Sequence, residues 1–139
     1  MERTLVKTLH GRPVYGGKAE GIALCCPDSI TGWCGVDVKT GVIIENGHIH
    51  RGESIKNRIV LLPNGKGSVG WSCHFTAVAA AGNAPAGWVL RKVDTRIGVA
   101  TITMKIPAAC DFEEDPFDVI RDGDFIRLDG DTGIVEIWR

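Results

Sequence analysis

One short stretch limits the possible folds more than any other: the apolar run Ile59–Leu62, which ends at a glycine-rich turn, residues 63–68, and precedes an alanine-rich segment. A continuous apolar run of this length is typical of a buried strand. Residues 69–81 are followed by Gly82 and Pro85, in the order in which helices commonly end. The sequence therefore predicts a strand, a tight turn and a helix in succession, the local architecture of an α/β domain.

Most of the other regular segments have the apolar runs or the alternation of β-strands. These predicted strands are residues 4–9, 14–15, 22–26, 42–44, 88–90, 125–128 and 134–138. Residues 129–133, Asp-Gly-Asp-Thr-Gly, predict a hairpin turn between the last two. Residues 96–104 fit either a second helix or a strand, because their β-branched side chains disfavour a helix. Residues 27–41 have little periodicity and predict a long loop, a kind of segment that often carries function.

The length and the charge of the chain narrow its class. With 139 residues, 44% of them hydrophobic, the chain suffices for a single domain, residues 1–139, with its own core. The net charge is −1 and the basic residues are scattered, which argues against a nucleic-acid or anionic-membrane partner. No apolar run approaches the roughly 18 residues of a membrane span, and the polar N-terminus lacks a signal-peptide core. We therefore expect a soluble, cytoplasmic protein.

The five cysteines have no paired spacing, which suits free thiols in a reducing compartment. A metal site is one interpretation of five residues that lie close together in the sequence, because thiolate and imidazole bind zinc well: Cys25, Cys26, Cys34, His48 and His50. However, adjacent cysteines on a strand point to opposite faces, so Cys25 and Cys26 cannot easily share an ion. We expect structural cysteines and no metal site, with the two histidines facing solvent or a subunit interface.

The turn at residues 65–68, Gly-Lys-Gly-Ser, has the chemistry of an anion site. Gly65 and Gly67 permit positive φ angles and close backbone approach, Lys66 supplies a charge, and Ser68 precedes a helix N-terminus. A substrate carboxylate or a serine alkoxide would be stabilised there. The alternative is architectural: Ser68 caps the helix, worth about 1 kcal/mol, and the glycines only shape the turn. The residues alone leave both interpretations open.

Six short motifs follow one another along most of the chain. They are residues 17–24 (G-x-A-x-G-x-A-L), 35–41 (G-V-D-x-x-T-G), 52–55 (G-x-x-I), 65–68 (G-x-G-S), 84–86 (A-P-A) and 123–130 (G-D-x-x-x-x-D-G). No single motif is specific. The ordered set, however, resembles the small swivel subunit of the aconitase X hydro-lyases.

That resemblance implies a fold and a division of labour. The fold would be a swivelling β/β/α domain of the aconitase type, an α/β fold rich in strands with one main helix after the Gly-Lys-Gly-Ser turn. The partner would be a large subunit that holds an iron–sulfur cluster through its own cysteines, so this chain alone would bind no cofactor. Carried over to this sequence, Ser68 would be the catalytic base. Lys66, Gly67 and Asp37 would bind or orient the substrate, and Trp33 would contact the large subunit.

Three segments depart from the family pattern: Val69-Gly70-Trp71, which places an indole in the first helical turn, the pair Trp33-Cys34, and residues 94–112. They bear on the identity of the substrate, a small hydroxy acid. We expect cis-3-hydroxy-L-proline, with mevalonate 5-phosphate as the alternative. A hypothesis of another class is a non-catalytic swivel-like module that binds an anion or a partner protein.

Overall fold

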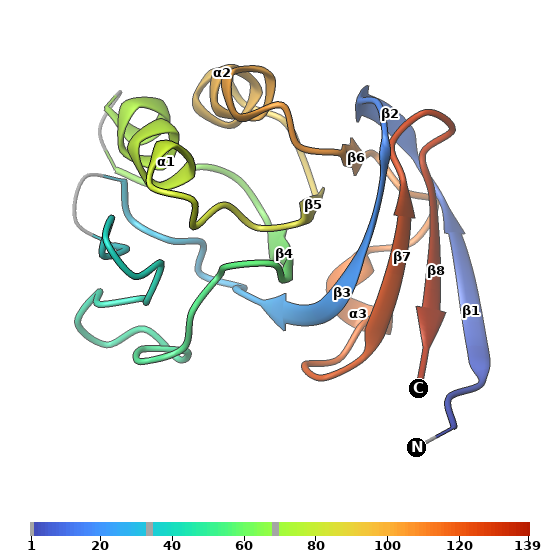
Figure 1. Cartoon of the computed structure of the whole chain (residues 1–139). Coiled ribbons are helices and arrows are strands. Elements are labelled where there is room, and N and C mark those ends of the chain that lie inside the picture. Colours follow the sequence, from blue (N-terminus) through green and yellow to red (C-terminus); the bar gives the residue numbers. More distant parts are fainter. Residues whose placement is uncertain (1, 33–34, 68–69) are drawn as a thin grey trace.

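The computed structural model describes residues 2–32, 35–67 and 70–139, and these form one curved sheet with three helices (Figure 1). The strands are β1 (Leu5–His10), β2 (Arg12–Tyr15), β3 (Lys18–Cys25), β4 (Ile59–Leu62), β5 (Gly87–Leu90), β6 (Ala108–Cys110), β7 (Phe125–Asp129) and β8 (Ile134–Trp138), and the helices are α1 (Trp71–Ala80), α2 (Thr95–Met104) and α3 (Pro116–Val119). The strand-rich α/β class is confirmed. The structure adds a second ten-residue helix, α2, to the one main helix expected.

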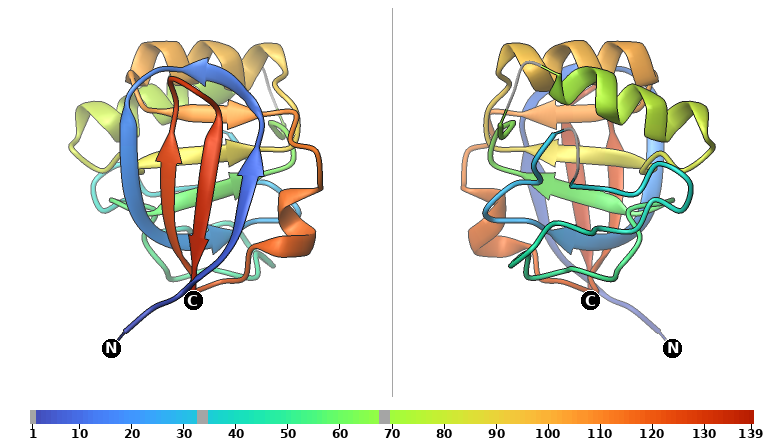
Figure 2. Two further views of the ribbon diagram at one scale, coloured as in Figure 1. Left: turned by 90° about the vertical axis from the view of Figure 1, so that its right-hand side faces the viewer. Right: turned by 90° about the vertical axis from the view of Figure 1, so that its left-hand side faces the viewer.

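The eight strands lie in the order β1-β8-β7-β3-β4-β5-β6-β2. Strands β1, β8, β7 and β3 pair antiparallel, strands β3 to β6 pair parallel, and β2 is antiparallel to β6. The two outermost strands, β1 and β2, are consecutive in the chain with Gly11 between them. The sheet therefore curls until its ends approach each other, as the left view of Figure 2 shows.

Two hydrophobic cores lie on opposite faces of the parallel strands. One core fills the space between the parallel and antiparallel parts of the sheet and includes Ile59 and Leu61. The other lies beneath α1, α2 and residues 26–32 and 35–58, and it includes Val60 and Leu62. All four residues of β4 are thus buried, which explains its uninterrupted apolar run. Together the elements form the three layers of a β/β/α arrangement.

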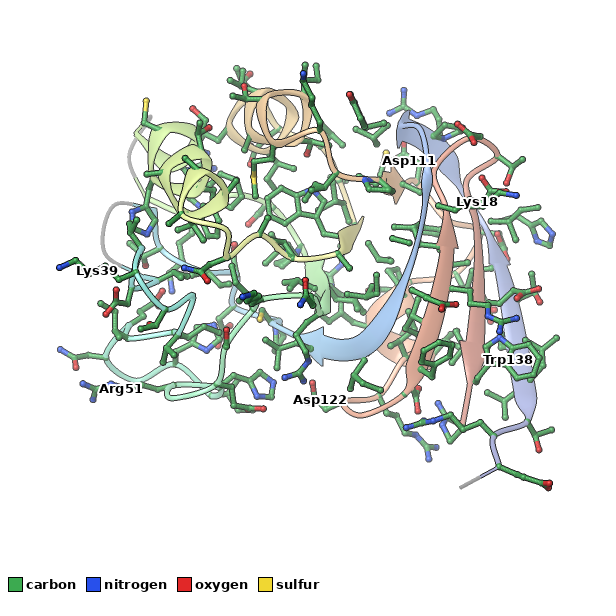
Figure 3. The ribbon with its side chains drawn as sticks, viewed as in Figure 1. Lys18, Lys39, Arg51, Asp111, Asp122 and Trp138 are labelled. Atoms are coloured by element: carbon green, nitrogen blue, oxygen red, sulfur yellow. The ribbon has the colours of Figure 1, made fainter. Side chains whose placement is uncertain are left out.

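Residues 42–44 are not a strand of the sheet, contrary to the sequence prediction. They make only isolated bridges, Val36 to Ile43 and Val42 to Ser54, within a segment that folds back on itself. Ile43 is fully buried in the core under the helices, and its N–H donates to Glu53 O at 2.9 Å. The apolar pattern there reflects burial without membership of the sheet. Residues 42–44 belong to the loop segment 35–58, on which Figure 3 labels Lys39 and Arg51, and this segment lies on the far side of the molecule from Trp138.

Residues 96–104, which the sequence left undecided, are helical as part of α2. The carboxylate of Asp94 accepts a hydrogen bond from Ile97 N and caps the helix. The hydroxyls of Thr101 and Thr103 donate to the carbonyls four residues earlier, at 2.7 and 2.8 Å. The Asp94 cap and the burial of Ile97, Ala100 and Thr101 outweigh the low helix propensity of the β-branched residues. No described helix has the length and apolar character needed to cross a membrane.

Candidate functional site

The segments after β3, β4 and β5 converge at the carboxyl edge of the parallel strands (Figure 2). Ser29, after β3, donates through its hydroxyl to Asn64 O, after β4. Gly32 N donates to Lys66 O at 3.1 Å, and Gly65 N donates to a carboxylate oxygen of Asp94, after β5, at 2.7 Å. Open parallel sheets bind ligands at this edge, so the candidate site lies where the fold favours one.

The two glycines of the turn are required for different reasons. Gly67 is exposed and has φ +85°, a conformation that side chains disfavour. Gly65 is buried, and a Cβ added there would lie 2.9 Å from Arg96 Nε and 3.1 Å from Asp94 Oδ2. The predicted positive φ is thus confirmed at Gly67. At Gly65 a glycine is needed because the side chains of Asp94 and Arg96, at the start of α2, leave little room for a Cβ.

Asp94 and Arg96, at the start of α2, hold the turn by its backbone. Arg96 donates to Gly67 O at 2.8 Å and to Gly65 O at 3.2 Å, while Asp94 accepts from Gly65 N. Asp94 and Arg96 also pair with each other at 3.1 Å. Burial alone would raise the pKa of the Asp94 carboxyl, but the N–H groups of Ile97 and Gly65 and the guanidinium hold that pKa below its ordinary value. Asp94 is therefore a carboxylate at neutral pH.

Lys66 pairs with a carboxylate on the other side of the turn. Its Nζ lies 2.8 Å from Glu45 Oε2, and the Lys66 side chain is 41% exposed against 15% for Glu45. The other oxygen of Glu45 accepts from Thr31 N at 2.6 Å. Burial opposes ionisation of Glu45, yet the bonds from Lys66 and Thr31 outweigh it and lower the pKa. The predicted cation is present at the turn, but its charge is already paired.

Helix α1 begins at Trp71, and Gly70 is its N-cap residue. The interpretation of Ser68 as the N-cap is therefore wrong, because the helix starts later than the sequence suggested. Ser68 and Val69 themselves lie outside the described residues, as do Trp33 and Cys34. The structure consequently leaves the assignment of Ser68 as base, and of Trp33 as an interface residue, as predictions.

The indole of Trp71 is fully buried and joins the helix start to the segment after β3. Its Nε1 donates to Ile30 O at 2.8 Å, and its ring packs on Phe75 at a centroid distance of 4.3 Å. A Cβ on Gly32 would lie 2.5 Å from Trp71 Cα, so this contact requires glycine. The indole that departs from the family pattern is a core residue beside the site.

Asp37 is half-buried and organises its own loop. Its carboxylate accepts from Lys39 N at 2.8 Å, and its carbonyl accepts from Gly41 N at 2.7 Å. Asn83, just after α1, donates to the neighbouring Val38 O. Within the part of the chain that the structure describes, these bonds place Asp37 in a local turn and do not connect it with Lys66.

His48 and His50 are buried, contrary to the prediction that they face solvent or an interface. His48 Nδ1 accepts from His50 N, so its Nε2 carries the proton that is donated to Ser29 O at 2.9 Å. His50 lies between Glu53 at 2.6 Å and Asp122, labelled in Figure 3, at 3.2 Å. The segment turns at both residues and is not extended, so its histidines point inward and tie the loops together.

The described cysteines are free thiols, of which Cys25, Cys26 and Cys110 are buried and Cys73 is exposed. Cys25 and Cys26 lie in different cores on opposite faces of the sheet, as predicted. Burial, with a further contribution from Asp122, raises the pKa of Cys25 to about 12, and burial also raises the pKa of Cys26. Metals bind the thiolate, which these surroundings disfavour. Residues 2–32, 35–67 and 70–139 contain no group of three His, Cys, Asp or Glu side chains that could hold a metal ion.

Three residues that contact the turn are not predictable as site residues from the sequence: Glu45, Asp94 and Arg96. Glu45 lies 21 positions before Lys66, and Asp94 lies 29 positions after Gly65, so no local pattern joins them to the turn. A signal was present for Asp94 alone, since an aspartate directly before a helix-sized segment is a common N-cap.

Comparison with known proteins supports the ordered motifs. A family model described as the aconitase X swivel domain matches residues 8–137. The chain is 36% identical over 129 residues to the phosphomevalonate dehydratase small subunit of Methanocella arvoryzae, covering 93% of this chain and 98% of that protein. It is 33% identical to the protein of the same name from Methanosarcina acetivorans, covering 93% and 90%. The crystal structure of Thermococcus kodakaraensis aconitase X in its holo form matches with a TM-score of 0.88 at 30% identity, covering 95% of this chain and 98% of that one.

Proposed function

This chain belongs to the aconitase X swivel domain family, and we propose that it is the small subunit of a two-subunit hydro-lyase that dehydrates mevalonate 5-phosphate. The observation that carries the proposal is the near full-length similarity to relatives named phosphomevalonate dehydratase small subunit. The sequence alone favours cis-3-hydroxy-L-proline as the substrate, whereas these relatives favour the alternative, mevalonate 5-phosphate.

In this proposal Ser68 is the base. Dehydration of a 3-hydroxy acid removes a proton from the carbon beside the carboxylate and hydroxide from the next carbon, which leaves a double bond and water. A serine hydroxyl takes up that proton only as the alkoxide, so its surroundings must favour negative charge. In the turn before Ser68, Gly67 has φ +85°, and the ammonium group of Lys66 is paired with Glu45 at 2.8 Å.

The large subunit would provide the second wall of the site and the iron–sulfur cluster. Three of the described thiols, Cys25, Cys26 and Cys110, do not suit such a cluster, because burial raises the pKa of each and disfavours the thiolate. Lys66, Gly67 and Asp37 remain our candidates for contacts with the substrate. Lys66 and Arg96 are both paired with carboxylates, so we infer that the large subunit supplies most of the positive charge for the phosphate.

The test uses the chain assembled with its large subunit and compares turnover of mevalonate 5-phosphate with that of cis-3-hydroxy-L-proline. We expect turnover of the first only, and none with this chain alone. Ser68→Ala should lower kcat by about 10² to 10⁴-fold, the usual contribution of a positioned base, with little change in KM. Ser72→Ala, a serine in the first turn of α1, is the matched control. Near-normal kcat in a folded, assembled Ser68→Ala enzyme would remove the catalytic assignment.

A further inference from the structure

The Arg96 side chain forms hydrogen bonds with the backbone of the turn in addition to its ion pair with Asp94. Its guanidinium donates to Gly67 O at 2.8 Å and to Gly65 O at 3.2 Å, and it also reaches Asp94 Oδ2 at 3.1 Å. Three acceptors on two segments are thus held by one planar group, whose donors have a fixed geometry. The backbone on both sides of Lys66 is fixed from α2.

We propose that Arg96, oriented by Asp94, is a positioning residue that holds residues 65–67, the described part of the turn that precedes the proposed base in the sequence. This inference rests on the proposed function, in which Ser68 is the base. Gly67, which accepts the shorter of the two backbone bonds, is the residue directly before Ser68 in the sequence. Small displacements of a catalytic group are costly, since about 1 Å of misplacement can lower a rate about 100-fold.

Asp94 divides two tasks between its two carboxylate oxygens. Oδ1 accepts from Ile97 N at 3.0 Å and caps α2, whereas Oδ2 accepts from Gly65 N at 2.7 Å and from Arg96. An asparagine retains one oxygen for the cap but presents an NH₂ group where Oδ2 accepts two bonds. Asp94→Asn therefore removes the contact with the turn while it preserves the start of the helix.

The pairing of Arg96 also decides which kinetic constant should change. Its charge is balanced by Asp94 at 3.1 Å, and three of its contacts are already made within the chain. A direct substrate contact would mainly affect KM, whereas a residue that positions the base affects kcat. Lysine at position 96 keeps the charge but cannot reach the three acceptors with one planar group.

The experiment measures mevalonate 5-phosphate dehydration by the assembled enzyme with Arg96→Lys and with Asp94→Asn. Each should lower kcat about 10 to 100-fold with KM within about twofold of the parent. Combined with Ser68→Ala, neither should lower kcat further, because the base whose position they control is gone. Arg12→Lys is the control, since Arg12 pairs with Asp111 at 2.7 Å on the β2 and β6 edge and should leave kcat unchanged.

The outcomes separate this inference from the function on which it rests. If Ser68→Ala leaves kcat intact, the proposed function fails first. If Ser68→Ala lowers kcat but Arg96→Lys and Asp94→Asn do not, only the positioning role is overturned. It is also overturned if either variant raises KM at constant kcat, or lowers kcat equally in the Ser68→Ala background. Should Arg96→Lys fold poorly, Asp94→Asn decides alone.

Discussion

The pair between Lys66 and Glu45 allows a prediction in which energy and function can be measured separately. Glu45→Gln keeps an oxygen to accept from Thr31 N, so it removes mainly the charge opposite Lys66. Lys66 is 41% exposed, and solvent screens the attraction, so we expect a coupling of about 0.5 to 1 kcal/mol. Glu45→Ala also leaves Thr31 N without its acceptor, which adds about 1 to 3 kcal/mol to the destabilisation.

The assay is denaturant unfolding of the full chain in a double-mutant cycle of Glu45→Gln and Lys66→Met. The sign of its pH dependence follows from Glu45, whose pKa is lowered from 4.5 in the folded chain. The stabilisation should be complete above pH 4.5 and should disappear as the pH falls through the folded value. A coupling below about 0.2 kcal/mol at neutral pH, or equal losses for Glu45→Gln and Glu45→Ala, would refute this reasoning.

The same variants test the substrate role of Lys66 in the assembled enzyme. If the ammonium contacts the substrate, Lys66→Met should raise KM about tenfold, the effect of losing roughly 1.4 kcal/mol of binding. Glu45→Gln should not raise KM, because it leaves the ammonium in place and less neutralised. Equal kinetic effects of the two substitutions, with KM unchanged, would show that Lys66 only supports the turn.

Two further predictions concern the structure around the site. Gly32→Ala should cost about 1 to 3 kcal/mol and reduce activity, because its Cβ would meet the backbone of Trp71 at 2.5 Å. Gly47→Ala, at φ +79° with open space around the added Cβ, should cost about 1 kcal/mol of stability and leave activity intact. If the two variants lost equal stability in unfolding assays and equal activity in turnover assays, the steric argument would be contradicted. Burial lowers the pKa of His74 from 6.5, with a bond to the Val36 backbone acting in the opposite direction, so the unfolded chain binds more protons and stability should fall as the pH drops below about 6.5. His74→Phe should lose less stability between pH 7.5 and pH 5 than the parent, and parallel pH curves for the two would refute this expectation.

The parts of the fold that local chemistry determines were predictable from the sequence. The run Ile59–Leu62, the segment that forms α1 and the hairpin of β7 and β8 each carry their own periodicity and turn residues. The prediction of a strand at residues 42–44 is wrong because burial against helices produces the same apolar run as burial in a sheet. Strand β6, only three residues long, carries too short a pattern to be recognised.

The candidate site was predictable only in its central turn. Lys66 and Gly67 are adjacent in sequence and carry visible chemistry, whereas their partners come from other loops. Glu45 and Arg96 reach the turn because β3, β4 and β5 are parallel and end at one edge, and the sequence does not reveal which loop residues meet there. The histidines were misjudged for the same reason, since their acceptors, Cys25 O and Ser29 O, are distant in sequence.

Two of the departures from the family pattern, Trp71 and residues 94–112, lie within the described part of the chain. Trp71 enters the core and fixes the segment around Ile30, so its indole does not shape a substrate pocket. Residues 94–112 begin with Asp94 and include Arg96, both of which contact the turn through its backbone. Asp94 and Arg96 thus hold the described part of the turn, residues 65–67, whereas Trp71 holds the neighbouring segment around Ile30. Catalytic sites need residues that are held in place by their neighbours, and the contacts of Asp94 and Arg96 with residues 65–67 are the reason why we favour an active subunit over a non-catalytic module.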